Sequence, residues 1–315
     1  MIGPLPIKLF HGVYLLGSYE FNTYLIRGKK CALIEGGVSN QFLLILRQLE
    51  YLEISPNDID FLVILHSHAD HIMSFPPLQE HFPWMQIAAF EGSKKVFNDE
   101  RLVNKFKESD LKIAQSLYEA GMVDGRVYHS SSLLFPMNLS LREGDQLELG
   151  ERINLRVLET PGHAPDNISI YLGEEKVLFV SDAVGIYYPP DYIKPNFFYD
   201  LSMHQSSLLR IQEIGAKVLC KGHQGMVIGE KKVQDYIQFA FNGIEKFKRY
   251  VQEALLAGKD EEEVSKKFTN IHQWGISAFF PWESNFRLSR LLIKRTLGYF
   301  DKEIRKNLNK SKKDL

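Results

Sequence analysis

Hydrophobic and polar positions in the first third of the chain predict strands followed by a helix and a further strand. Residues 8–35 contain short apolar runs separated by turn residues, a pattern typical of a strand meander. Residues 40–51 place apolar side chains at helical spacing, so we expect a helix that covers one sheet face. Residues 61–65 form an uninterrupted apolar run, typical of a strand buried on both faces. These elements predict the α/β class.

Longer helical patterns occupy two later regions. Residues 91–123 carry apolar positions at helical spacing without proline, and we expect a helical insertion that either covers the sheet or helps to form a substrate entrance. From residue 229 onward the pattern is helical and rich in aromatic side chains. We therefore expect a first domain at residues 1–228 and a helical carboxy-terminal extension at 229–315. The aromatic segment 271–282 is expected to pack between these helices, to line a pocket or to form a dimer contact.

Four potential metal ligands lie within six residues directly after the strand predicted at 61–65: His66, His68, Asp70 and His71. One residue separates His66 from His68, so both imidazoles can reach the same ion from an extended backbone. Asp70 and His71 follow where the chain turns into a helix, and neighbours on a helix diverge by roughly 100°. They therefore suit a second ion better than the first. The alternative is an exposed polar loop with clustered histidines.

Three later polar residues follow strand-like runs in the same way: His163, Asp182 and His223. Gly162 and Gly222 precede the two histidines and let the backbone turn sharply near a crowded centre. Taken alone, each histidine could be a turn or core residue, and Asp182 could cap the next element. Their shared position at strand ends favours a common site.

This order of residues resembles the metallo-β-lactamase-fold hydrolase superfamily, whose His-x-His-x-Asp-His signature precedes a further His, a bridging Asp and a final His. The resemblance covers roughly residues 8–228 and implies an αββα sandwich that holds two metal ions. It assigns one metal to His66, His68 and His163, the other to Asp70, His71 and His223, and the bridging position to Asp182.

A shorter resemblance concerns the branch of this superfamily that contains the quinolone-signal response thioesterase. Glu35, where the superfamily more often has Asp, is followed by two glycines, and the segment 181–185 and the helical tail also look like that branch. The resemblance implies an acyl thioesterase or ester hydrolase.

The implied chemistry is that of a dinuclear hydrolase in which a metal-bridging hydroxide attacks a carbonyl or a phosphorus atom. Asp70 would accept or relay the proton as this nucleophile forms. Zinc is the first expectation for the two divalent ions, with iron or manganese as alternatives, because imidazole-rich sites with a bridging carboxylate suit all three. Thioester or ester hydrolysis is favoured. A phosphodiesterase, a lactonase and a quorum-sensing-type regulator that acts by protein interaction are the alternatives.

Composition and charge give no nucleic-acid or membrane signal. Of the 315 residues 44% are hydrophobic, and the formal net charge of −1 provides no general attraction to nucleic acid or to an anionic membrane. We expect a small-molecule substrate, with a homodimer through the carboxy-terminal helices as one further option. Cys31 and Cys220 lie in apolar runs typical of buried free thiols. Without a signal-peptide pattern or an apolar run long enough to span a bilayer, the expected location is the cytoplasm.

Overall fold

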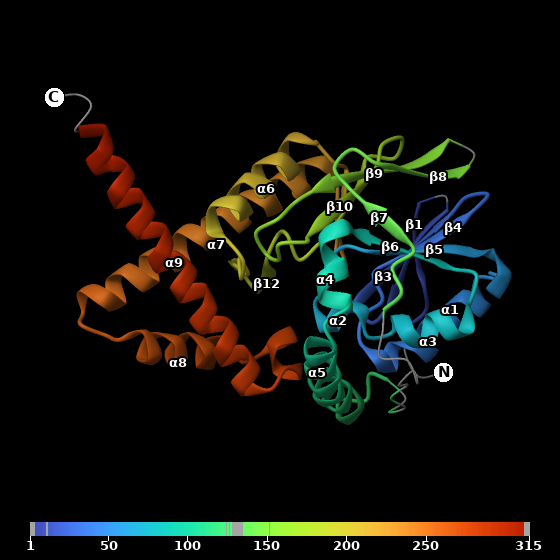
Figure 1. Ribbon diagram of the computed structural model, residues 1–315, viewed down its shortest axis with the longest axis horizontal. Coiled ribbons are helices and arrows are strands. Elements are labelled where there is room, and N and C mark those ends of the chain that lie inside the picture. Colours follow the sequence, from blue (N-terminus) through green and yellow to red (C-terminus); the bar gives the residue numbers. More distant parts are fainter. Residues whose placement is uncertain are drawn as a thin grey trace.

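Two β-sheets pack face to face and carry helices on their outer surfaces (Figure 1). The structure is a computed structural model and describes residues 4–10, 12–123, 125, 127, 135–150 and 152–311. The αββα arrangement predicted through the resemblance is confirmed, including the helices that follow the second sheet. No described helix is both long enough and apolar enough to cross a bilayer.

The first sheet has its strands in chain order. They are β1 (Ile7–Phe10), β2 (Val13–Gly17), β3 (Asn22–Arg27), β4 (Cys31–Ile34), β5 (Ile59–Ile64), β6 (Gln86–Phe90) and β7 (Leu139–Leu141). The first four are antiparallel, which confirms the predicted meander, and β4 to β7 run parallel. Alternate β5 side chains point to the two faces: Leu62 packs toward the helices, and Val63 packs toward the second sheet.

The second sheet has the order β15-β14-β11-β10-β9-β8. Its strands are β8 (Gln146–Gly150), β9 (Ile153–Glu159), β10 (Ile168–Leu172), β11 (Val177–Ser181), β14 (Val218–Lys221) and β15 (Met226–Ile228). The connection from β11 to β14 contains a separate hairpin, β12 (Ile186–Tyr188) and β13 (Tyr192–Lys194). Apolar side chains from both sheets, among them Ile34, Val157 and Phe179, form the core between them.

Helices cover the outer face of each sheet. The first face is covered chiefly by α1 (Phe42–Tyr51) and α3 (Phe75–His81), and α1 confirms the helix predicted at 40–51. The second face is covered by α6 (Leu201–Glu213) and α7 (Glu230–Leu256), and α8 (Glu261–His272) and α9 (Trp282–Ser311) pack with these helices in the same apolar cluster. Because α7 shares its core with β11 and β14, the carboxy-terminal helices complete the second layer, and a boundary at residue 228 stays a prediction.

The region 91–123 is helical, as expected, with α4 (Lys94–Phe97) and α5 (Glu100–Glu119). Asp110 of α5 accepts hydrogen bonds from the amide and the hydroxyl of Ser39, which fixes the helix beside the loop after β4. Ile113 and Leu117 of α5 pack with Ile276 of the short helix η4 (Gly275–Phe279). The insertion and the carboxy-terminal segment therefore meet on one side of the sandwich.

The packing of α7 against the hairpin depends on a glycine in the helix interior. A Cβ at Gly243 would collide with the backbone carbonyl oxygen of Ile193 in β13. We expect Gly243→Ala to lower the free energy of unfolding by about 1–3 kcal/mol, because helix and hairpin must separate. Gly298→Ala in α9 is the matched control, since no atom lies within 4 Å of that Cβ, and it should stabilise the helix by up to about 1 kcal/mol. Denaturant unfolding measures both changes, and equal stability of the two variants would contradict the expected clash.

Candidate metal centre

All seven residues proposed as ligands lie together at one edge of the sandwich. His66 and His68 follow β5, and Asp70 and His71 belong to the short helix α2 (Ala69–Ile72). His163 follows β9, Asp182 follows β11 and His223 follows β14. Two sheets thus deliver side chains from four strand ends to the same place. Metal ligation itself stays a prediction.

The first donor group contains three imidazoles. His163 Nε2 lies 3.2 Å from His66 Nε2 and 2.8 Å from His68 Nδ1. The donor atoms of the three histidines lie within 4.8 Å of one another, as ligands of a single ion must.

The second donor group pairs two imidazoles with a carboxylate. Asp70 Oδ2 lies 3.4 Å from His71 Nε2 and 3.4 Å from His223 Nε2. These residues form a second set of converging donors. The structure thus places His66 and His68 in one group of donor atoms and Asp70 and His71 in the other, and their division between two metal ions stays a prediction.

Asp182 lies between the two groups. Its Oδ2 is 3.5 Å from His163 Nε2 in the first group, and its Oδ1 is 3.4 Å from His223 Nε2 and 3.7 Å from His71 Nε2 in the second. Each oxygen of one carboxylate therefore faces a different donor group, which is the geometry of a bridging ligand.

Backbone carbonyls fix the tautomers of two of these histidines. His163 Nδ1 donates to the carbonyl oxygen of Asn196 at 2.8 Å, and His223 Nδ1 donates to that of Glu20 at 2.6 Å. Because a carbonyl oxygen can only accept, Nδ1 carries the proton in both neutral rings and Nε2 presents a lone pair to the cluster.

Glu35 orients one histidine of each donor group. His71 Nδ1 and the Ser181 hydroxyl both donate to Glu35 Oε2. The Ser181 oxygen in turn lies 3.1 Å from His66 Nδ1 and accepts its proton. Glu35, which in the sequence only marks a family resemblance, thus points the Nε2 atoms of His66 and His71 into the cluster. Glu35, His66 and His71 form a third group of converging donor atoms. Because Glu35 Oε2 already accepts from His71 and Ser181, these atoms face one another in hydrogen bonds.

Unusual backbone conformations hold these residues in place. Glu35 and Ser181 have φ angles of 65° and 49°, which are left-handed values uncommon for side chains larger than glycine. A Cβ at Gly222 would lie 2.6 Å from His71 Cε1 and 3.0 Å from Asp182 Oδ1, and one at Gly162 would collide with the backbone of α6. The predicted need for glycine beside the ligands is confirmed.

The two donor groups differ in electrostatics. Burial and the neighbouring imidazoles hold the pKa of His66 well below its usual value, and burial lowers the pKa of His163 to about 3 despite the opposing effect of Asp182. In the second group burial lowers the pKa of His71, but the neighbouring carboxylates of Glu35, Asp70 and Asp182 outweigh it and raise that pKa well above its usual value. Asp182 and Asp70 raise the pKa of His223 to about 9 against the effect of burial. The acidic side chains therefore attract positive charge to this group.

The donor set fits two divalent cations. His71 Nε2 and Asp182 Oδ1 are buried and have no hydrogen-bond partner among the described residues. The lone pairs of His66 Nε2 and His163 Nε2 face each other across 3.2 Å. Cations between these atoms would satisfy them at once, whereas the cluster without them leaves buried polar atoms uncompensated.

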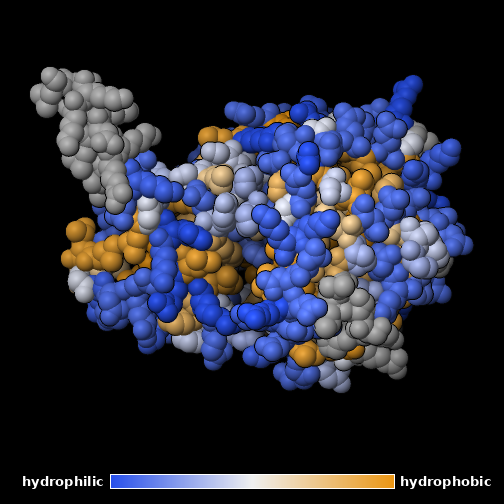
Figure 2. Space-filling model, in the orientation of Figure 1, coloured by the Kyte–Doolittle hydropathy of each residue, from blue (hydrophilic) through white to orange (hydrophobic). Residues whose placement is uncertain are grey.

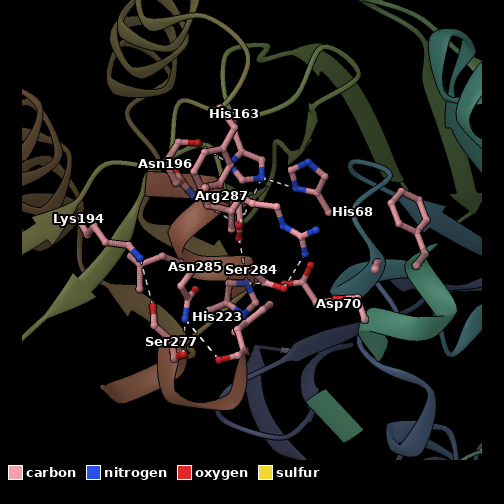
Figure 3. A pocket seen from close by; sticks show the side chains of 18 residues that line it. His68, Asp70, His163, Lys194, Asn196, His223, Ser277, Ser284, Asn285 and Arg287 are labelled. Carbon is pink, nitrogen blue, oxygen red and sulfur yellow. Dashed lines mark hydrogen bonds and ion pairs between the residues drawn. The ribbon is translucent and has the colours of Figure 1, made fainter. Parts of the chain in front are cut away.

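A cavity of about 270 Å³ opens beside the cluster (Figure 3). Part of its wall comes from Phe106 and Ser109 of α5, so the predicted insertion contributes to a pocket. Two of the roles expected for the aromatic segment 271–282 are seen: Ile276 packs in an apolar core, and Phe280 lines the cavity. Polar residues that were not predicted from the sequence form the wall across the cavity from the cluster: Lys194, Asn196, Ser277, Ser284, Asn285 and Arg287. Their spacing along the chain carries no motif that could have identified them.

Comparison with known proteins places this site in a family. A model of the metallo-beta-lactamase superfamily matches residues 21–223. The chain belongs to this superfamily. The matched segment contains all seven residues of the cluster, and members of the superfamily bind divalent metal ions at such clusters.

Individual superfamily members are distant in sequence. The chain is 26% identical over 230 residues to the metallo-beta-lactamase fold-containing protein ST1585 of Sulfurisphaera tokodaii, covering 71% of this chain and 81% of that protein. The crystal structure of that protein gives a TM-score of 0.55 over 72% of this chain and 85% of the other. A family member from Thermus thermophilus, TTHA1429, is 22% identical and gives a TM-score of 0.61 over 94% of this chain and 95% of the other, which shows the shared fold.

Flavorubredoxins also match, but over a smaller part of their length. The anaerobic nitric oxide reductase flavorubredoxin of Pectobacterium carotovorum is 27% identical over 191 residues. The match covers 59% of this chain and 32% of the flavorubredoxin. The chain therefore spans about a third of those proteins.

The Glu35 network predicts a defect in metal binding that reaches both groups. Both oxygens of Glu35 accept hydrogen bonds, one from the Leu65 amide and the other from His71 and Ser181. In Glu35→Gln an NH₂ group, which cannot accept, replaces one of them, so either the Leu65 contact or the contacts to His71 and Ser181 are lost. We expect the wild type to bind two ions per chain. In the variant the affinity for these ions should fall by about 10–100-fold. Elemental analysis and competition with a chelator measure this change. Glu50→Gln, at an exposed carboxylate of α1, is the control, and unchanged affinity in Glu35→Gln would refute the orienting role.

Proposed function

We propose that this protein is a dinuclear metal-dependent hydrolase that cleaves an acyl thioester or ester. One observation carries the proposal: two donor groups joined by Asp182 open directly onto a cavity with apolar walls. Two bound divalent ions would supply a hydroxide nucleophile at neutral pH and polarise a substrate oxygen. Zinc is the first choice of metal, with iron or manganese as alternatives.

The side chains around the cluster have separate parts in this reaction. Although burial opposes its ionisation, the imidazoles of His71 and His223 hold the pKa of Asp70 well below its usual range. Asp70 also lines the cavity, so its carboxylate can accept a proton from the reacting water. Asp182 would bridge the ions held by the two groups. Glu35 orients two imidazoles and does not contact the substrate.

The cavity walls favour an acyl group over a nucleic acid. Apolar side chains from the insertion, the hairpin region and the carboxy-terminal segment line it: Phe106, Ile186, Phe198, Phe280 and Leu288. Such walls suit the hydrocarbon part of an acyl chain, and the near-neutral chain offers no general attraction for a phosphate backbone. The carboxy-terminal helices agree with the resemblance to the quinolone-signal response thioesterase, which stays a prediction.

Other functions use the same fold. A phosphodiesterase or a lactonase would need the same cluster, and a regulator acting by protein interaction would not need turnover. The reductase activity in the names of the flavorubredoxins belongs to proteins of which two thirds lie outside the match, and it supports no assignment here. We also propose that the protein acts in the cytoplasm and on a small-molecule substrate.

A homodimer through the carboxy-terminal helices also stays a proposal. Apolar surface gathers over these helices at the left of Figure 2. Leu255 and Leu256 at the end of α7 are among the exposed apolar residues of these helices, and Leu256 is 82% exposed. Scattered exposed apolar residues are ordinary on monomers, so this surface supports the option without deciding it.

Turnover of matched substrates tests the reaction. The metal-loaded protein should hydrolyse glutathione or coenzyme A thioesters faster than an aryl phosphodiester. His68→Ala should lower kcat by at least about 100-fold, because a ligand of one ion is lost. His81→Ala removes an exposed histidine outside the cluster and should retain full activity. The proposal fails if no thioester or ester is turned over in a metal-dependent way; a cellular phenotype that survives His68→Ala would support the regulator.

A further inference from the structure

Two cationic side chains line the cavity that opens beside the metal cluster. They are Lys194, at the end of β13, and Arg287, in the second turn of α9. Neither has an ion-pair partner within the described part of the chain: Lys194 donates to the Ser277 hydroxyl at 3.2 Å, and Arg287 donates to the Ser284 hydroxyl at 3.2 Å. Figure 3 shows both reaching toward the space beside the cluster.

The position of Lys194 is fixed by its neighbours. Its Nζ lies 5.4 Å from the centre of the Tyr188 ring, over the ring face, as well as against Ser277. The Ser277 oxygen is itself 2.5 Å from the Tyr188 hydroxyl. An ammonium group held by a hydroxyl and a ring has donor capacity left over, and this capacity is available to a molecule in the cavity.

The charge lining the cavity is strongly unbalanced. Among the described lining residues only Asp70 and Asp182 are acidic, and both belong to the metal cluster. With two divalent ions, those carboxylates leave the donor atoms at a charge of about +2, or about +1 when the buried Glu35 behind His71 is counted as well. Lys194 and Arg287 add further positive charge beside apolar walls, where unpaired charges interact strongly with an anion.

The two cations differ in depth. Arg287 is exposed, whereas Lys194 is half-buried and contacts buried Ser277. A molecule in the cavity can therefore meet Lys194 with its enclosed part and Arg287 with its part at the rim. The apolar side chains that line the cavity suit the acyl half of a thioester better than a polar thiol such as glutathione.

On the basis of the proposed function, we propose that Lys194 selects acyl groups that carry an anionic terminus, with a carboxylate as the simplest case. Lys194 is then a specificity-determining residue. It does not take part in bond cleavage, and the substrate class is an ω-carboxyacyl thioester or ester.

Matched substrates separate the charge of the acyl group from the charge of the leaving thiol. Glutaryl and pentanoyl thioesters of N-acetylcysteamine differ only in the terminal carboxylate and share a neutral thiol. Pentanoyl-glutathione carries its charge on the thiol instead. We expect the wild type to prefer the glutaryl over the pentanoyl compound by roughly 10- to 100-fold in kcat/KM, the effect of one charged hydrogen bond.

Three variants assign this preference. Lys194→Met should remove it, chiefly by raising KM for the glutaryl compound, while kcat for the pentanoyl compound changes much less and the metal content is retained. Lys194→Arg should restore part of it. Lys246→Met removes a lysine of α7 that faces Asp191 on the hairpin turn at 4.0 Å, and as the control for general electrostatics it should keep the preference.

A binding measurement decides the inference even without turnover. Glutarate and pentanoate can each place one carboxylate on the cluster, but only glutarate has a second for Lys194. Calorimetry should show tighter binding of glutarate to the metal-loaded wild type and equal binding of the two acids to Lys194→Met. Equal binding by the wild type, a preference that survives Lys194→Met, or a preference found only with pentanoyl-glutathione would overturn the inference. Absence of any thioester or ester hydrolysis together with a Lys194-dependent glutarate preference would instead refute the proposed reaction alone.

Discussion

The buried carboxylate of Glu35 is the constraint on which the metal centre depends. It accepts the proton of His71 directly and that of His66 through the Ser181 hydroxyl. One group therefore orients a histidine in each half of a two-part cluster. Because Oε1 of the same carboxylate accepts the Leu65 amide at 3.2 Å, the strand that carries the histidines is held by the residue that orients them. The left-handed backbone at Glu35 and Ser181 is the local cost of this arrangement.

The seam between the sheets explains why the cluster forms where it does. Asn22 and Tyr24 of β3 hydrogen-bond to the carbonyl oxygens of Lys221 and Gly225, on either side of His223. The loop that carries the last histidine of the second sheet is thus attached to the first sheet. Parallel strands in both sheets end at this edge, and polar side chains at such ends meet where two layers join.

How far the sequence predicted this structure depended on whether the signal was local. The helix at α1 and the meander of β1 to β4 follow from the spacing of nearby apolar residues. The seven cluster residues could be identified because they lie in one local run after β5 and in the loops after β9, β11 and β14, in the order typical of the superfamily, and Gly162 and Gly222 mark the crowding. The role of Glu35 could not be predicted, since it acts through Ser181, 146 residues away. The far wall of the cavity was missed for the same reason: Lys194 and Asn285 converge only through packing of the hairpin, η4 and α9.

The cluster and much of the wall that faces it across the cavity come from different parts of the chain. The cluster is built from strand ends within the segment that matches the superfamily, residues 21–223. The opposite wall includes Ser277, Phe280, Asn285 and Arg287, which lie beyond that segment. A substitution in the carboxy-terminal wall can change which molecule enters without altering any donor atom, its tautomer or the network around Glu35. Shared ligands consequently say little about the substrate, and the residues that face them across the cavity carry that information.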